Sequence, residues 1–242
     1  MKKVSVILPV YNESECIEKT LYSIREYLKN SLNYHFIFVN DGSTDDTKNI
    51  IENKLNKLHT NQLSLISYPE RKGKGFAVGY GVQYADGDYI CFIDSDLAYS
   101  LEHLEELVEK LKIFDVVIGC RNLHPDSIKN VKLSRMIAGK VFNVLSNKIL
   151  DLGYQDMQAG LKGFKSQVAK EIFKKQELTG FSFDAELLYL AKKLGYTIGE
   201  ISAKVSEKHQ YKISKVKLLK DSLQMFIDLL MIRFYDWTGR YE

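Results

Sequence analysis

Residues 89–96 read YICFIDSD, a short apolar run that ends in two aspartates separated by a serine. A continuous apolar run of this length predicts a strand buried on both faces, as in a parallel sheet covered by helices. Asp94 and Asp96 follow that strand directly, and their carboxylates are hard oxygen ligands that suit a divalent cation. The run therefore predicts a fold class and a metal site, although a D-x-D pattern alone also suits a solvated turn or a helix cap.

The segments on either side repeat an alternation of strand and helix. Strands are predicted at 4–8, 34–39, 63–67, 88–93 and 115–120, with helices at 13–29, 45–58, 73–84 and 101–111. This order is typical of parallel β-α-β units, whose ligands bind beyond the carboxyl ends of the strands. The later segments are predicted as a basic helix at 126–150, a Gly-rich segment at 153–164, a helix at 181–194, a strand at 197–205 and an amphipathic helix at 214–237.

Composition and charge narrow the class of protein. The chain has 242 residues and a net charge of +3, which gives no reason to expect nucleic acid as a partner. Its three cysteines lie far apart without a C-x-x-C pair, so neither a disulfide framework nor a zinc ribbon is expected, and a reducing cytosol suits them. Neither a signal sequence nor a membrane-spanning run is expected. We therefore expect one large cytoplasmic domain with a C-terminal extension.

Two more motifs lie beside predicted strand ends. Asp41-Gly42-Ser43 places a carboxylate where it can accept an N–H from a nucleobase, with a glycine that allows close approach; a capped turn is the alternative. The stretch RKGKG at 71–75 is cationic and Gly-rich at a helix start, which suits a phosphate or a ribose, or else an ordinary basic turn. It is neither a P-loop nor a dinucleotide fingerprint, because Gly75 replaces the Ser or Thr and the glycine spacing is one residue too long.

Taken in order, VSVILPVYNE (4–13), NDGSTD (40–45), GKG (73–75) and DSD (94–96) closely resemble glycosyltransferase family 2, which has the GT-A fold. DMQAGLKGF (156–164) and FSFDAELL (181–188) are similar to its dolichyl-phosphate β-glucosyltransferase and dolichol-phosphate mannose synthase branch. The resemblance implies an α/β GT-A catalytic domain over 1–206, with a nucleotide-binding half at 1–120 and an acceptor half at 121–206. A basic amphipathic extension is expected over 207–242.

The same resemblance implies a donor site that holds a nucleotide sugar and a Mg²⁺ or Mn²⁺ ion. The nucleoside would be held by Pro9, Tyr11, Glu13 and Asp41, and Lys74 would approach the nucleotide. The ribose, the diphosphate and the metal would be held by Asp94, Ser95 and Asp96. Asp94 and Asp96 are the implied metal ligands. The implied reaction is inverting transfer of a hexose, which we expect to come from a UDP-sugar. Two positions depart from the family pattern: Arg71 replaces an asparagine, and Ala98 replaces a glutamine common in mannose synthases.

The chemistry of the acceptor decides what the second half must supply. A sugar hydroxyl needs a general base, whereas a phosphate monoester, with a second pKa of about 6, is already mostly a dianion at pH 7 and needs cations. The cations after residue 120 are Arg121, Lys129, Lys132, Arg135 and Lys140. Arg121 and Arg135 match the positions of phosphate-binding arginines in the lipid-phosphate branch. We expect Asp96, Asp156 and Arg135 to be catalytic. If the acceptor is a hydroxyl, Asp156 is expected to be the general base, with Asp184 as a second candidate. If the acceptor is a phosphate, Asp156 is expected to be a positioning residue.

The last predicted helix carries apolar residues at helical spacing after a lysine-rich run. These are Leu219, Leu223, Phe226, Leu230, Phe234 and Trp237. Such a helix suits a membrane interface, or else packing on the domain or in a homo-oligomer. We expect an enzyme at the cytosolic membrane face that transfers a hexose to polyprenyl or dolichyl phosphate. The alternatives are transfer to a surface-glycan hydroxyl, GDP-mannose-dependent transfer to polyprenyl phosphate, and a nucleotide-sugar sensor without catalysis.

Overall fold

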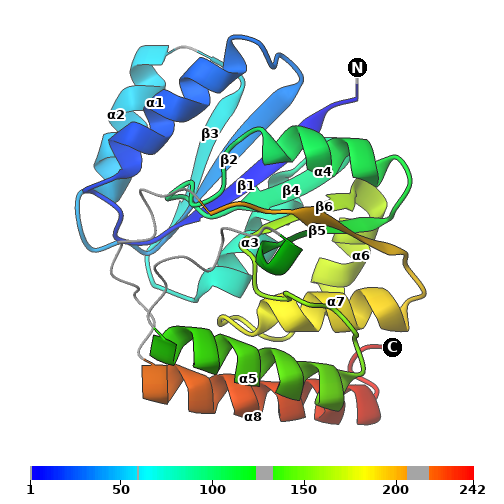
Figure 1. Cartoon of the computed structure of the whole chain (residues 1–242). Coiled ribbons are helices and arrows are strands. Elements are labelled where there is room, and N and C mark those ends of the chain that lie inside the picture. Colours follow the sequence, from blue (N-terminus) through cyan, green and yellow to red (C-terminus); the bar gives the residue numbers. More distant parts are fainter. Residues whose placement is uncertain (1, 59, 124–132, 206–217) are drawn as a thin grey trace.

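Strands and helices alternate along most of the chain, as Figure 1 shows. The computed structural model describes residues 2–58, 60–123, 133–205 and 218–242, without the side chains of 133–140 and 218–222. The strands are β1 (Val4–Val10), β2 (Tyr34–Asp41), β3 (Leu63–Tyr68), β4 (Tyr89–Ile93), β5 (Val116–Cys120), β6 (Leu161–Lys165) and β7 (Ile198–Ser202). The helices are α1 (Ile17–Leu28), α2 (Thr47–Leu58), α3 (Lys74–Tyr84), α4 (His103–Leu111), the 3-10 turn η1 (Arg121–Leu123), α5 (Leu133–Leu150), α6 (Ser166–Lys175), α7 (Phe183–Lys193) and α8 (Leu218–Trp237).

The described strands form one sheet in the order β3-β2-β1-β4-β6-β5-β7. Neighbours are parallel except for β6, which runs antiparallel to both β4 and β5. The mostly parallel α/β architecture predicted from the sequence is therefore confirmed. The sequence predicted neither β6 nor α6, since it indicated only a Gly-rich segment up to residue 164 and no further element before residue 181.

Strand β4 shows why the sheet is buried on both faces. Tyr89, Cys91 and Ile93 belong to the core that α1, α2 and α4 cover, whereas Ile90 and Phe92 belong to the core that α3, α6 and α7 cover. All five side chains are buried, as the apolar run requires. Alternate residues of a strand face opposite sides, so one uninterrupted apolar run satisfies both helical layers.

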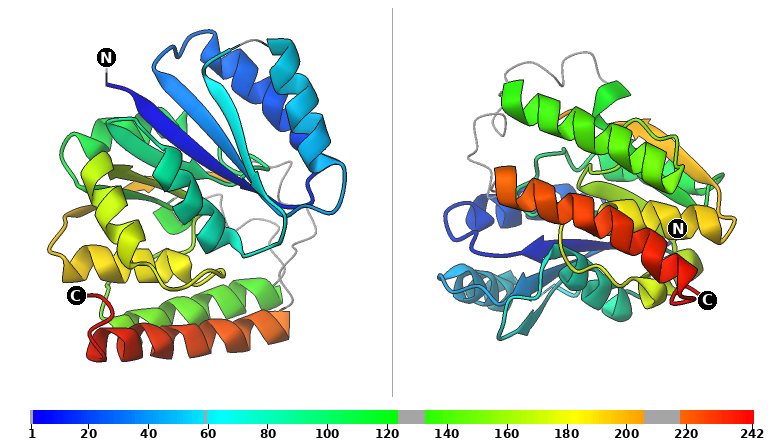
Figure 2. Two further views of the ribbon diagram at one scale, coloured as in Figure 1. Left: turned by 180° about the vertical axis from the view of Figure 1, so that it is seen from behind. Right: turned by 90° about the horizontal axis from the view of Figure 1, so that it is seen from below.

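The helices α5 and α8 lie side by side below α7, on the side of the sheet that α7 covers (Figures 1 and 2). Leu229, Ile232 and Tyr241 are buried in the core, so the C-terminal segment packs on the domain. The two helices also carry exposed large apolar side chains, a set that we call the α5/α8 apolar face. It comprises Val141, Val144, Leu223, Phe226, Ile227, Leu230, Phe234 and Trp237. Within the described residues, no helix has both the length and the apolar character needed to cross a bilayer.

Candidate active site

The strands β1, β2 and β4 bring the predicted donor residues to one edge of the sheet. Ile7 of β1 pairs with Ile37 on one side and with Phe92 on the other, so the three strands end close together. Pro9 lies near the end of this register, opposite Val39. The turns after the three strands therefore meet, as expected for the carboxyl edge of a parallel sheet.

The turns after β1 and β2 are tied to each other by side chains. Asn12 has a φ of 51°, a left-handed conformation that asparagine tolerates better than most residues. Its side-chain Oδ1 accepts from the Thr44 backbone N–H at 2.8 Å, and the Glu13 N–H donates to Thr47 Oγ1 at 2.8 Å. The Glu13 carboxylate accepts from Cys16 Sγ at 2.9 Å. These bonds hold Glu13 and its neighbours at the start of α1.

Asp41 shapes the loop that precedes α3. Its buried carboxylate accepts hydrogen bonds from Tyr68 Oη at 2.9 Å and from the backbone N–H groups of Lys72 and Gly73 at 2.6 and 3.0 Å. Burial, together with the charge of Asp41, raises the pKa of Tyr68. The loop so held lays the Arg71 guanidinium over the ring of Tyr11, 4.3 Å from its centroid. Nucleobase binding by Asp41 stays a prediction, and its contacts assign it the anchoring of this loop.

The glycines of the GKG motif allow helix α3 to start against another backbone segment. A Cβ on Gly73 would lie 2.4 Å from the carbonyl oxygen of Thr179, and one on Gly75 would lie 2.7 Å from the Cβ of Phe183. Gly73 also has a φ of 107°, which residues with a side chain rarely adopt. The close approach aims Lys74 inward, where its Nζ lies 2.7 Å from Oδ1 of Asp94.

The D-x-D turn after β4 is built around a second close approach. The Asp94 N–H donates to the carbonyl of Gly160 at 3.0 Å, and a Cβ on Gly160 would lie 1.9 Å from Asp94 Oδ2. Ser95 is buried, and its carbonyl accepts from Thr20 Oγ1 at 2.7 Å. Asp96 Oδ1 accepts from the N–H of Ala98 at 3.1 Å, closing the turn. Both aspartates are half-buried and lie at the sheet edge, as predicted.

A buried lysine and aspartate that the sequence does not assign to the donor site lie behind Lys74. Lys162 of β6 is fully buried, and its Nζ donates to Asp184 Oδ1 at 2.5 Å and to the carbonyl of Ala159 at 2.8 Å. Asp184 Oδ2 lies 4.0 Å from Lys74 Nζ. Asp184 is the second candidate for a general base, but its carboxylate faces two ammonium groups. The only signal in the sequence is a lysine inside the QAGLKGF segment, which looks like a surface residue.

The loop that packs on Gly73 and Gly75 is anchored by hydrogen bonds to a buried glutamate. Glu186 of α7 is fully buried, and it accepts from the backbone N–H groups of Glu177 and Leu178, each at 2.9 Å. Tyr241 Oη donates to the same carboxylate at 2.6 Å. Burial raises the pKa of Glu186. Through Glu186, the C-terminal Tyr241 supports the segment against which Lys74 is placed.

Among the residues predicted to serve the acceptor, Arg121 and Asp156 form a bidentate pair. Arg121 Nε and its terminal nitrogen donate to the two carboxylate oxygens at 2.6 and 2.8 Å, and the Arg121 backbone N–H donates to Oδ2 at 3.0 Å. Burial of Asp156 acts to raise its pKa, but the Arg121 guanidinium outweighs it and holds that pKa below its usual range. The predicted cations Lys129 and Lys132 lie outside the described residues, as do the side chains of Arg135 and Lys140 in α5. The structure thus brings together Arg121 and Asp156 from the predicted acceptor set.

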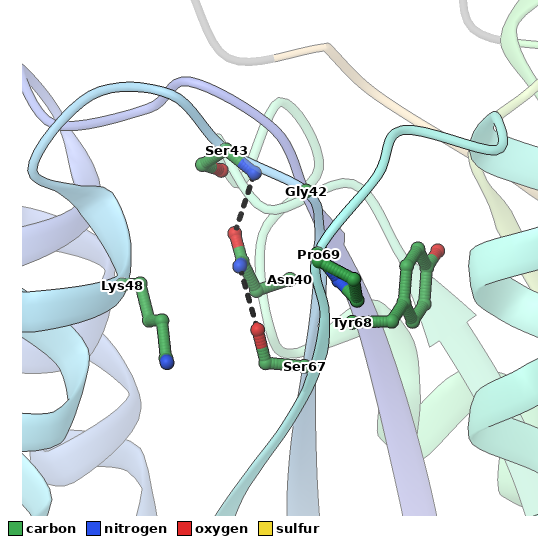
Figure 3. Close-up of a pocket in the computed structure, with 7 residues that line it drawn as sticks. All are labelled: Asn40, Gly42, Ser43, Lys48, Ser67, Tyr68 and Pro69. Carbon is green, nitrogen blue, oxygen red and sulfur yellow. Dashed lines mark hydrogen bonds between the residues drawn. The ribbon is translucent and has the colours of Figure 1, made fainter.

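A separate hollow of about 260 Å³ lies at the ends of β2 and β3, beside α2 (Figure 3). Its lining comprises Asn40, Gly42, Ser43, Lys48, Ser67, Tyr68 and Pro69. Asn40 spans its floor, since its side chain donates to Ser67 Oγ at 2.8 Å and accepts from the Ser43 N–H at 3.3 Å. The hollow borders the Asp41 turn and lacks both aspartates of the D-x-D motif.

The mostly parallel sheet, with the D-x-D turn at its carboxyl edge, has the architecture of the GT-A glycosyltransferases. Residues 5–173 match the family described as Glycosyl transferase family 2, and the chain belongs to that family.

Relatives and solved structures agree with this assignment. The chain is 30% identical to a dolichyl-phosphate beta-glucosyltransferase of Dictyostelium discoideum, over 99% of this chain and 76% of the relative. It is 31% identical to a dolichyl-phosphate beta-glucosyltransferase of Trichomonas vaginalis, over 96% of this chain and 71% of the relative. Glucosyl-3-phosphoglycerate synthase of Mycobacterium tuberculosis, solved with Mn²⁺, UDP and glucosyl-3-phosphoglycerate, superposes with a TM-score of 0.66 at 20% identity, covering 96% of this chain and 79% of that one. At that identity the structural likeness concerns the fold.

Proposed function

We propose that this glycosyltransferase moves a hexose from a UDP-sugar to a polyprenyl phosphate. The observation that carries the proposal is the bidentate Arg121–Asp156 pair. A carboxylate whose two oxygens both accept from a guanidinium, and whose pKa is lowered by it, is a poor general base. A hydroxyl acceptor needs such a base, whereas a phosphate dianion does not. The relatives named as dolichyl-phosphate glucosyltransferases support the same acceptor class.

The donor half suits a uridine nucleotide. Tyr11 and Arg71 present a stacked aromatic ring and guanidinium at the sheet edge, a surface that suits a planar base. Lys74 places a cation beside Asp94, where the diphosphate of the donor would bind. The solved neighbour contains UDP, which supports uridine over guanosine.

A divalent ion fits the D-x-D turn when it is bound together with the donor. Within the described residues, no three His, Cys, Asp or Glu side chains gather as a metal site, so the chain offers the carboxylates of Asp94 and Asp96. Mg²⁺ is commonly held by one or two carboxylates together with substrate phosphates and water. Oδ1 of Asp94 already contacts one cation, the Lys74 ammonium. When bound, the ion neutralises charge on the departing diphosphate.

The reaction we propose is a single displacement with inversion at the anomeric carbon. A phosphate oxygen of the acceptor forms a new bond to that carbon as the bond from carbon to the diphosphate oxygen breaks. UDP leaves with the bonding electron pair, and no proton has to move from the acceptor. Arg135 binds and aims the acceptor phosphate, because a guanidinium group matches its oxygens in two-point contacts, and Arg121, whose Nε and one terminal nitrogen are held by Asp156, adds its positive charge.

We propose that the α5/α8 apolar face contacts the membrane that carries the lipid acceptor. A folded protein rarely leaves so many large apolar side chains exposed together unless another surface covers them. Trp237 is 84% exposed, and tryptophan favours the level of lipid headgroups. Six lysines between residues 204 and 220 precede or begin α8 and add attraction to an anionic leaflet, which is the cytosolic one. We therefore propose peripheral binding at the cytosolic membrane face.

The decisive assay supplies radiolabelled UDP-glucose, Mn²⁺ and a polyprenyl phosphate in vesicles containing anionic lipid. Transfer of label to the lipid extract is expected, with β-linked product when an α-linked donor is used. Label found on a soluble oligosaccharide instead would support a glycan hydroxyl as the acceptor, and activity with GDP-mannose alone would support a mannosyltransferase. Binding of UDP-glucose without transfer to any acceptor would support a sensor and contradict the proposal.

A further inference from the structure

Four charged side chains of alternating sign lie in a row behind the donor site, and we call them the four-charge row. In order they are Lys162, Asp184, Lys74 and Asp94. They come from β6, α7, α3 and the turn after β4, so only the tertiary fold brings them together. The row begins in the interior and ends at Asp94, whose side chain is 34% exposed.

The inner end of the row is a lysine with no access to solvent. Lys162 is 0% exposed, and its Nζ lies 5.6 Å from the ring centroid of Phe92. Burial lowers the pKa of Lys162, while the charge of Asp184 opposes that shift. A buried ammonium is costly unless it is paired and hydrogen-bonded, and Lys162 meets that condition through Asp184 and the carbonyl of Ala159.

The distances in the row are unequal. The Nζ of Lys162 lies 2.5 Å from Oδ1 of Asp184. The Nζ of Lys74 lies 4.0 Å from Oδ2 of Asp184 and 2.7 Å from Oδ1 of Asp94. Asp184 thus attracts both ammonium groups and is in hydrogen-bond contact with one of them. Lys162 holds Oδ1 of Asp184, whereas Oδ2 faces Lys74, whose ammonium group stays in contact with Asp94.

We propose that Lys162 is a positioning residue which, through Asp184, determines how firmly Lys74 is held on Asp94 and so how readily Asp94 exchanges that ammonium for a divalent ion. This inference rests on the proposed function, since it concerns the metal ligand of the donor site. Lys162 touches neither donor nor metal. It acts by holding Oδ1 of Asp184 and offsetting the charge of that carboxylate, which would otherwise withdraw Lys74.

The test uses the full-length protein saturated with UDP and calorimetric titration with Mn²⁺, because the proposed ion site includes phosphates of the donor. In Lys162→Met, Asp184 is free to attract Lys74 away from Asp94. Mn²⁺ then no longer competes with the Lys74 ammonium for Asp94 and binds about fivefold more tightly. In Asp184→Asn, Lys74 loses its second anion and stays on Asp94, so Mn²⁺ binds about fivefold more weakly. Lys165→Met is the matched control, because Lys165 is on the same strand but pairs with Asp115, and it leaves the affinity unchanged.

The double variant Lys162→Met/Asp184→Asn separates positioning from net charge. It removes one positive and one negative charge, so long-range electrostatics alone predicts wild-type affinity, whereas the positioning role predicts the weaker binding of Asp184→Asn. It also leaves no unpaired buried charge, so it serves if a single variant fails to fold by circular dichroism. Shifts of the two single variants in the same direction, or a double variant that binds like wild type, overturn the inference. Absence of Mn²⁺ binding by the wild type overturns both the inference and the proposed metal role.

Discussion

Gly160→Ala tests whether the position of Asp94 controls activity. A Cβ at residue 160 would lie 1.9 Å from Asp94 Oδ2, whereas ordinary contacts begin at 3.4 Å. The Asp94 carboxylate must therefore retreat by about 1.5 Å, and misplacement by about 1 Å can cost roughly 100-fold in rate. Overpacking of this kind also costs about 2 kcal/mol of folding free energy, which corresponds to a fall in Tm of roughly 4–8 °C for a domain of this size.

The assay for Gly160→Ala combines thermal unfolding, UDP and Mn²⁺ titration, and kcat/KM for the donor. We expect a folded protein whose kcat/KM falls at least about 100-fold, with most of the loss in steps that need Asp94. Gly180→Ala is the control, because a Cβ at residue 180 meets nothing within 4 Å. Metal binding and kcat/KM equal to wild type in Gly160→Ala would refute the assignment of Asp94 to the donor site.

Three further predictions address the acceptor side and the C-terminus. The pKa of Asp156 is depressed, so the stability that its pair with Arg121 contributes is present above pH about 4 and is lost as pH falls. At pH 7 the Asp156→Asn variant should be less stable than wild type by about 2 kcal/mol. The difference in Tm between the two proteins should shrink as the pH falls below about 4, and a difference that grows on acidification would contradict this role of the pair. Tyr241→Phe removes the hydrogen bond to Glu186 and should cost about 1 kcal/mol in denaturant unfolding, while no loss would mean that this contact contributes nothing. Arg135→Ala should raise the KM for polyprenyl phosphate about tenfold with an unchanged donor KM, and an unchanged acceptor KM removes Arg135 from the phosphate site.

Much of the donor half could be predicted from local sequence. The apolar runs of β1, β2 and β4 have the length and composition of strands covered on both faces, and the motifs follow them at fixed offsets. Because parallel strands end at one edge, that order alone predicts that residues from the ends of β1, β2 and β4 meet. The expectation that Asp94 and Asp96 lie at this edge is met by the structure.

The acceptor half was less predictable for identifiable physical reasons. Strand β6 reads LKGFK, with two lysines and a glycine that disfavour a central strand. In the structure the strand pairs with both β4 and β5, and Lys162 is satisfied by Asp184 and a backbone carbonyl, partners that are distant in sequence or invisible to periodicity. Likewise, the carboxylate of Asp156 looks like a possible base until Arg121 is found to occupy both of its oxygens.

The sequence alone determined the alternation of buried strands and helices, the sheet edge where the predicted ligand-binding residues lie and the residue types that gather there, because these depend on periodicity and on the direction of parallel strands. The tertiary structure alone decided the state of each charged group: Asp41 anchors a loop, Asp156 is locked to an arginine, and Lys162 is buried against Asp184. The charge and basicity of a side chain depend on its burial and on the partners within a few ångströms, and those partners come from remote parts of the chain.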